Sequence, residues 1–232
     1  MAERKIEICT FHGWALSADI WLPWENHLPS DIYWKHADKG YFGNRADVSF
    51  SRGVDKKILL VHSYGLHWCP PALLKETDHL VILSSFLSFH PEEPEKFKRS
   101  KLLLQKMMSR FVEKPYEVLY DFHQNVYSPD ACKPEFPDSL DHDLLLNDLD
   151  LLGESQISPN LLHQIPGITI IHGSSDKIVS KRKGRELYTV FNRRSQYLEI
   201  KGSGHAAGFI HARKSSMFMS PALEISEAQN RL

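Results

Sequence analysis

Residues 57–66 have the sequence KILLVHSYGL, in which an apolar, strand-forming run ends abruptly at His62-Ser63-Tyr64-Gly65. The run predicts a buried strand, and the residues after it predict a sharp turn with a serine at its apex, followed by a helix. Such a turn lifts a serine hydroxyl above the edge of a sheet, where a base can reach it. This stretch makes Ser63 the first candidate for a nucleophile.

The turn departs from the usual G-x-S-x-G pattern at one position. Gly65 occupies the second glycine position, but Val61 stands where the first glycine is expected. A β-branched residue there is expected to strain the turn or to require space nearby. A serine directly after a strand is also commonly a helix N-cap, so the turn alone does not assign a role to Ser63.

Length and composition limit the class of protein. A chain of 232 residues is long enough for one α/β domain that buries roughly 70–75% of its unfolded surface, with room for a small insertion. Contents of 42% hydrophobic and 25% charged residues are ordinary for a globular protein. With a net charge of −1, we expect neither nucleic acid nor a membrane as a partner.

The cysteines and the N-terminal residues indicate a cytoplasmic location. Residues 1–7 lack a long apolar run, and no apolar stretch approaches the roughly 20 residues that span a bilayer. Cys9, Cys69 and Cys132 are odd in number and lack metal-site spacing, and the thirteen histidines are scattered. We therefore expect reduced thiols and no bound metal.

Six short apolar runs predict the strands of a sheet. They are Ile6–Phe11, Ile32–His36, Lys57–Val61, His79–Leu83, Ile168–His172 and Gln196–Ile200. Continuous apolar strands separated by helices or loops indicate a parallel sheet that is covered on both faces. The spacing within Ser17–His27 predicts a helix, with Ser17 as its cap.

Residues 89–164 differ in character from the rest of the chain. Helical patterns cover Phe97–Val112, Pro115–Tyr127 and Leu140–Leu152, and no strand pattern occurs between them. We predict a helical cap insertion at 89–164, over one edge of a core formed by residues 1–88 and 165–232.

Three residues with complementary chemistry follow predicted strands. Ser63 follows the third strand, Asp176 the fifth and His205 the sixth, so all three are expected at the carboxyl edge of the sheet. A neutral imidazole can take the serine proton, and a carboxylate can orient and stabilise the resulting cation. A turn aspartate is the alternative interpretation of Asp176. A triad of this kind requires neither metal nor organic cofactor.

Ester hydrolysis by such a triad also requires donors for an oxyanion. Two backbone N–H groups normally supply them, and loss of one donor costs about 3–4 kcal/mol. The amide of Tyr64, directly after Ser63, is one candidate. The amide of Trp14, in the turn after the first strand, is the other.

Four motifs in this order resemble those of the α/β-hydrolases, and the resemblance covers nearly the whole chain. They are His12-Gly13-Trp14-Ala15-Leu16, the loop 38–43, the acid loop 173–179 and Gly204-His205-Ala206. Each is weak alone, and together they are specific. The resemblance implies an α/β-hydrolase fold, with a mostly parallel sheet flanked by helices and a helical cap, and it implies a serine hydrolase.

Within this family the chain is most similar to the pimeloyl-[acyl-carrier protein] methyl ester esterases of biotin synthesis. The similarity rests on residues 13–21, on Ser84-Ser85-Phe86 with the basic helix after it, and on residues 149–161. It implies a carboxylesterase that hydrolyses the methyl ester of pimeloyl-acyl-carrier protein.

The predicted helix Phe97–Val112 contains no acidic residue, and basic residues crowd it and its flanks. In the resembled group, basic cap residues hold the acidic carrier protein. The resemblance therefore implies acyl carrier protein as a partner. It assigns substrate or carrier binding to Phe86, Lys98, Arg99, Lys101, Lys106 and Arg110. A solvated helix face and a packed core phenylalanine are the structural alternatives.

Two other functions remain open at this point. The first is a general carboxylesterase or thioesterase with a different acyl substrate. The second is a non-catalytic binding protein with a hydrolase fold, which the valine at position 61 makes plausible. We expect a monomer in each case.

Overall fold

The computed structural model describes residues 5–130, 133–137, 139–191, 194–219 and 223. The expected cytoplasmic location rests partly on Cys132 and on residues 1–4, which lie outside this range. The other two cysteines, Cys9 and Cys69, are buried and free. In the described part of the chain, no helix is both long and apolar enough to cross a membrane.

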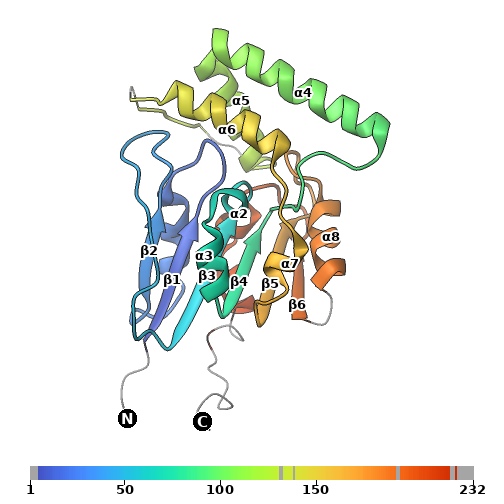
Figure 1. Cartoon of the computed structure of the whole chain (residues 1–232). Coiled ribbons are helices and arrows are strands. Elements are labelled where there is room, and N and C mark those ends of the chain that lie inside the picture. Colours follow the sequence, from blue (N-terminus) through green and yellow to red (C-terminus); the bar gives the residue numbers. More distant parts are fainter. Residues whose placement is uncertain (1–4, 131–132, 138, 192–193, 220–222, 224–232) are drawn as a thin grey trace.

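A six-stranded parallel sheet organises the chain (Figure 1), with strand order β2-β1-β3-β4-β5-β6. The strands are β1 (Ile6–Phe11), β2 (Tyr33–Ala37), β3 (Lys56–His62), β4 (His79–Leu83), β5 (Gly167–Gly173) and β6 (Ser195–Ile200). The four inner strands are mostly buried, while the edge strands β2 and β6 are mostly half-exposed. All six predicted strands are confirmed, with ends that differ by one residue at most.

Short helices cover the two faces of the sheet, and three longer helices lie beyond its carboxyl edge. The short elements are η1 (Ala18–Trp21), α1 (Leu22–Glu25), α2 (Gly65–Trp68), α3 (Pro71–Glu76), α7 (Pro159–Leu162), α8 (Lys181–Phe191), α9 (Ala207–Ile210) and α10 (Ala212–Phe218). The three longer helices are α4 (Pro94–Glu113), α5 (Pro115–Tyr127) and α6 (His142–Glu154), which together are named the helical layer.

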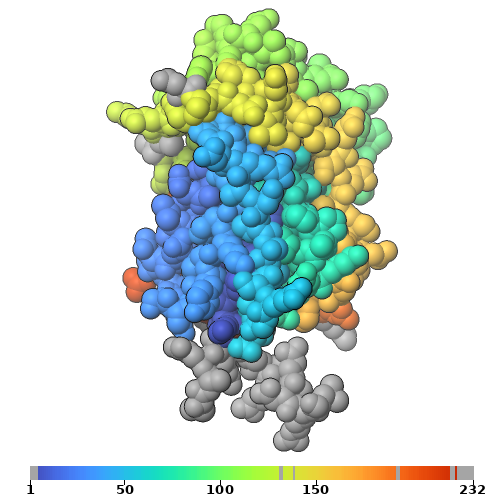
Figure 2. Space-filling model, turned by 60° about the vertical axis from the view of Figure 1, so that its left-hand side comes forward, coloured from blue at the N-terminus to red at the C-terminus, as the bar shows by residue number. Residues whose placement is uncertain are grey.

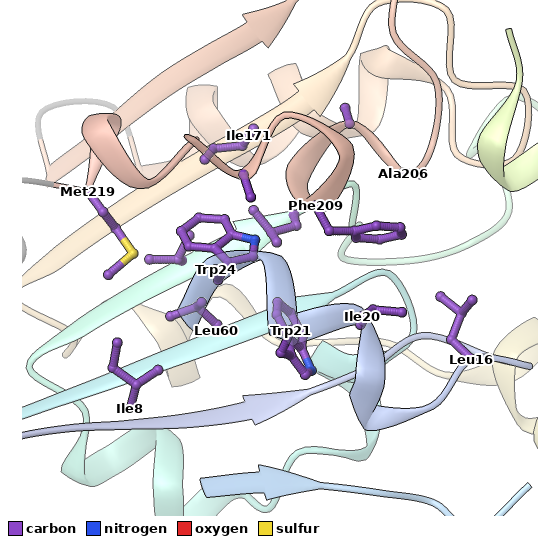
Figure 3. Packing of buried hydrophobic residues seen from close by; sticks show 14 of the residues in the cluster. Ile8, Leu16, Ile20, Trp21, Trp24, Leu60, Ile171, Ala206, Phe209 and Met219 are labelled. Atoms are coloured by element: carbon purple, nitrogen blue, oxygen red, sulfur yellow. The ribbon is translucent and has the colours of Figure 1, made fainter. Parts of the chain in front are cut away.

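Alternation along the strands divides the core between the two faces of the sheet. Ile58 and Leu60 of β3 face η1, α1, α9 and α10, where Trp21 and Trp24 are fully buried. Figure 3 shows both indole rings packed between the sheet and the C-terminal helices. The intervening residues of β3 face the side covered by α2, α3, α7 and α8. Successive strand residues point to opposite faces, so both faces need apolar side chains.

The helical layer forms one end of the molecule and lies above the rest of the chain in the view of Figure 2. Its underside joins a third apolar cluster with residues from the loops at the carboxyl edge, including Trp14 and Tyr64. A backbone bridge between Ser88 and Gln156 brings together the segments that enter and leave the layer. The exact division at residues 89 and 164 stays a prediction.

The predicted single helix at Ser17–His27 is wrong. The structure has a 3-10 turn, η1, followed by the four-residue α1, because Pro23 lacks the N–H that a continuous α-helix would need there. Ser17 stands at the N-cap position but does not cap, because its hydroxyl donates to Asp19 Oδ2 instead.

Candidate active site

Ser63 lies at a strained turn directly after β3. Its φ of 53° lies in the left-handed region, which is unusual for a residue other than glycine. The Ser63 N–H donates to Leu83 O at 2.9 Å, and the Ser63 carbonyl accepts from the Ser85 hydroxyl at 2.7 Å. These bonds to the end of β4 hold the backbone in a conformation that a free loop would leave.

Two glycines, and not position 61, provide the close approaches at this turn. A Cβ at Gly65 would clash with the carbonyl oxygen of Phe11, and a Cβ at Gly13 would lie 3.0 Å from Ser63 Cβ. Val61 is fully buried in the cluster on the α2 face, together with Leu66. The turn therefore closes without a glycine at the first position of the pattern.

The helix after the turn is also short. Helix α2 has four residues and ends at Trp68, and the backbone of the next residue, Cys69, is extended because Pro70 follows it. A separate helix, α3, starts two residues after Cys69, at Pro71. The helix directly after the turn is therefore a single short segment.

Asp176 and His205 form a close buried pair. His205 Nδ1 donates to Asp176 Oδ2 at 2.8 Å, and the two side chains are almost completely excluded from solvent. Asp176 Oδ1 accepts from the backbone N–H groups of Ile178 and Val179. Burial alone would raise the pKa of Asp176, but the nearby His205 and His172 outweigh it and hold that pKa below its usual range.

The loop that carries His205 contacts the turn after β3 through His62, the residue before Ser63. The Nε2–H of His62 donates to the His205 carbonyl at 3.2 Å, and the centroids of the two rings lie 4.7 Å apart. Ser63 and His205 are 5% and 1% exposed. The structure thus brings Ser63, His205 and Asp176 to one end of the sheet from the ends of β3, β6 and β5.

The two candidate oxyanion donors lie on the turns beside Ser63. Neither the Trp14 nor the Tyr64 amide donates to another backbone group in the described part of the chain. The turn that carries Trp14 is fixed at both ends. The Trp68 indole donates to His12 O at 2.9 Å, and the Trp14 indole donates to Leu145 O of α6 at 2.8 Å.

A cavity of about 590 Å³ lies between Ser63 and the helical layer. Its walls are mainly apolar and include Trp14, Phe89, Leu103, Met107, Phe122 and Leu149. Such a lining, with few polar groups, is typical of small-molecule sites. The charged or amide side chains at its walls are Lys106, Arg110, Asp121, Asn125 and Lys177.

The predicted substrate-binding residues divide into two groups. Lys106 and Arg110 line the cavity, whereas Lys98, Arg99 and Lys101 do not. Phe86 is also absent from the lining. It is fully buried beneath Phe89, whose ring centroid is 5.5 Å away.

Several basic side chains of α4 are neutralised locally. Lys98 lies 3.4 Å from Glu95, and Arg110 lies 2.7 Å from Asp121 and 3.2 Å from Glu117. In the described residues, Arg99, Lys101 and Lys106 have no ion pair. The net positive charge of this surface is therefore smaller than the sequence of the helix indicates.

Some residues at the site were not found from the sequence. Lys177 was missed as a wall of the cavity, although it follows Asp176 directly. His172 lies 3.2 Å from Asp176, and the Lys39–Asp148 ion pair lies under α6. The acid loop could have indicated His172, which lies four residues before the aspartate. No signal in the sequence links residues 39 and 148.

The described residues contain no group of three metal-ligating side chains close enough to hold an ion. Ser63, His205 and Asp176 bring a hydroxyl, an imidazole and a carboxylate to one end of the sheet. They form an arrangement that can generate and stabilise a serine nucleophile.

Comparisons with known proteins show the fold. No protein-family model matches the sequence, and neither does any curated protein. An esterase from Exiguobacterium antarcticum aligns with a TM-score of 0.77 and 12% identity over 95% of this chain and 93% of the other. The enol-lactonase from Burkholderia xenovorans LB400 gives 0.72 and 12% over 95% and 92%. A bromoperoxidase from Bacillus anthracis gives 0.64 and 15% over 94% and 92%. At these identities the likeness concerns the fold alone, and the predicted α/β-hydrolase fold is confirmed.

Proposed function

We propose that the protein is a serine carboxylesterase. The observation that carries this proposal is the buried His205–Asp176 pair, with an Nδ1–Oδ2 distance of 2.8 Å, beside a serine held at a positive φ. A serine that is only a helix N-cap needs neither a strained backbone nor a buried carboxylate–imidazole pair. The N-cap position of the helix that follows is occupied by Tyr64 and not by Ser63.

In the proposed reaction, the Ser63 hydroxyl attacks the ester carbonyl and His205 Nε2 takes its proton. Asp176 holds the Nδ1–H side of the ring and stabilises the imidazolium that forms. The Trp14 and Tyr64 amides donate to the oxyanion of the tetrahedral intermediate. His205 then protonates the departing alcohol, and an acyl-enzyme remains.

The second half of the reaction repeats these steps with water. His205 takes a proton from water, the hydroxide attacks the acyl carbonyl, and Ser63 leaves with the proton returned by His205. The apolar cavity is suited to an acyl chain, since burial of each methylene is worth about 0.8 kcal/mol.

For the natural substrate we propose the methyl ester of pimeloyl-acyl-carrier protein, hydrolysed for biotin synthesis by a cytoplasmic monomer. The support is the resemblance of the sequence, together with an apolar cavity whose walls include Lys106 and Lys177. The unpaired Arg99 and Lys101 on the outer surface of α4 would face the acidic carrier. Other acyl esters and thioesters remain the alternative for the same cavity.

The experiment that tests the esterase is hydrolysis of p-nitrophenyl butyrate by the wild-type protein and by Ser63→Ala. We expect the variant to lose at least about 10³-fold in kcat, because no other group supplies the nucleophile. A fluorophosphonate probe should label the wild type at Ser63. Turnover that survives the substitution, or a wild type that is neither active nor labelled, would contradict the proposal and favour a binding protein.

The carrier proposal is tested by the charge-reversed variant Arg99→Glu/Lys101→Glu. We expect kcat/KM for the carrier-bound ester to fall about tenfold or more, while p-nitrophenyl butyrate is hydrolysed at the wild-type rate. The control is Lys75→Glu/Arg182→Glu, which changes the net charge equally at exposed positions outside the helical layer. Equal losses in both variants would argue against docking on α4. Rescue of a biotin-requiring strain that lacks its esterase tests the pathway.

A further inference from the structure

His172, on β5, lies behind the carboxylate that orients the candidate base. Its Nε2 is 2.9 Å from the Val179 carbonyl and 3.2 Å from Asp176 Oδ2, the same oxygen that accepts from His205. An ionised carboxylate has about four lone-pair sites. At Asp176 these are met by three hydrogen bonds and by the edge of the His172 ring.

The surroundings of His172 fix which nitrogen carries its proton. A carbonyl can only accept, so the nitrogen that bonds to Val179 O must be an N–H donor. Nδ1 is buried and has no partner among the described residues, so a proton there would lack an acceptor. The ring is fully buried, and Gly184 of α8 packs so closely that a Cβ there would lie 2.7 Å from Nδ1. The ring is therefore closely packed between the acid loop and α8.

We propose that His172 is a positioning residue that keeps Asp176 ionised and correctly oriented toward His205. It does so in two ways. Its N–H holds Val179 and thereby the acid loop, and the positive end of the same N–H faces Asp176 Oδ2. The inference rests on the proposed function, because orientation of His205 matters only if His205 is the base.

The titratable groups around this carboxylate come from three strands. His172 is on β5, His205 follows β6, and His62 of β3 lies against the His205 ring. Helix α8 meets the His172 ring with Gly184, which has no side chain. The lowered pKa of Asp176 depends on both histidines that contact it. Removal of one of them is therefore expected to raise that pKa.

The test compares His172→Leu, which removes the N–H, with His172→Gln, whose amide nitrogen reaches about as far as Nε2. In His172→Leu we expect the Asp176 pKa, followed by ¹³C NMR, to rise by about 0.5–1 unit. The acid limb of kcat/KM should move to higher pH, with KM for p-nitrophenyl butyrate unchanged. His172→Gln should keep the Asp176 pKa and the pH profile of kcat/KM close to those of the wild type. The control His79→Leu removes a partly buried histidine at the start of β4, far from the acid loop, and should leave the Asp176 pKa and the pH profile of kcat/KM unchanged.

A readout on the wild-type protein keeps the proposal testable if the leucine variant does not fold. ¹⁵N NMR should show His172 protonated at Nε2 and bare at Nδ1, and an Nδ1–H tautomer would overturn the proposal. Identical Asp176 titrations in wild type and His172→Leu would overturn it too, even with esterase activity present. An inactive wild type would instead refute the proposed function, and the carboxyl titration would still decide what His172 does.

Discussion

Val61 occupies the position of the first glycine in the G-x-S-x-G motif, and its packing explains why a glycine is not needed there. A glycine in the first place of G-x-S-x-G is needed only if something lies against that position. Here the close contacts occur at Gly13 and Gly65, and Val61 packs in the core beside Leu66. The valine is accommodated by the fold, and it is no argument against a nucleophile at position 63.

This view predicts the outcome of restoring the usual motif. Val61→Gly should destabilise the protein by about 2–4 kcal/mol, because it removes a fully buried side chain and adds backbone freedom to a strand. The esterase activity per folded molecule should not increase. Urea unfolding and active-site titration would measure the two quantities. A variant that is more active at unchanged stability would show that the valine strains the turn.

At the scale of elements, helix α6 connects the helical layer to the loops around Ser63. Lys39 Nζ lies 2.9 Å from the fully buried Asp148 of α6, and the Tyr41 hydroxyl donates to the same carboxylate. The Lys39 ammonium also lies 5.8 Å from the centroid of the Tyr64 ring. The oxyanion candidate Tyr64 therefore packs against a cation that a helix of the layer holds in place.

Breaking this buried ion pair from one side should be costly. We expect Asp148→Leu to lower the free energy of unfolding by about 3–5 kcal/mol, since it leaves Lys39 charged and largely buried without its anion. The double variant Lys39→Met/Asp148→Leu should recover much of the loss, because an apolar pair needs no charge compensation. Urea denaturation of the wild type, of Asp148→Leu, of Lys39→Met and of the double variant measures the coupling. Simple additivity of the single losses would contradict it.

At the scale of the whole molecule, buried histidines make the fold sensitive to acid. Burial lowers the pKa of His67 to about 4, and burial with the nearby Lys56 lowers that of His79 to about 4. Between pH 6.5 and 4 the unfolded chain binds protons at these positions and the folded chain does not. Stability therefore falls as the pH drops through this window, by up to about 1.4 kcal/mol per unit and per histidine.

The variant His79→Gln tests this linkage away from the candidate site. Its amide can still bond to Thr169, which His79 Nε2 contacts at 2.8 Å, but it cannot titrate. We expect the unfolding free energy of the variant to fall less steeply than that of the wild type between pH 6 and pH 5, by about 1 kcal/mol. Urea unfolding at both pH values measures the slope. Parallel slopes in the two proteins would exclude His79 as a source of the acid sensitivity.

The sheet could be predicted from the sequence because each buried strand is a continuous apolar run. Ser63, Asp176 and His205 were expected at the carboxyl edge because each follows a predicted strand within a few residues, and the structure has them beyond the ends of β3, β5 and β6, while their roles stay predictions. The helix at Ser17–His27 was wrong because its apolar spacing outweighed the effect of Pro23. The partners of the basic helix, such as Glu95 and Asp121, lie outside the stretch whose charge was considered. Contacts such as Lys39–Asp148 join residues 109 positions apart, which no local pattern records.

The indole bond from Trp14 to Leu145 O has a consequence for protein engineering. The helical layer is an obvious module to exchange when a new substrate range is wanted. Yet the turn that carries one candidate oxyanion donor is anchored in that module. A chimera that replaces residues 89–164 would have to supply a carbonyl acceptor for the indole and an anion for Lys39. A graft chosen only for the shape of its cavity would carry over the pocket and lose the support of the turn that carries Trp14.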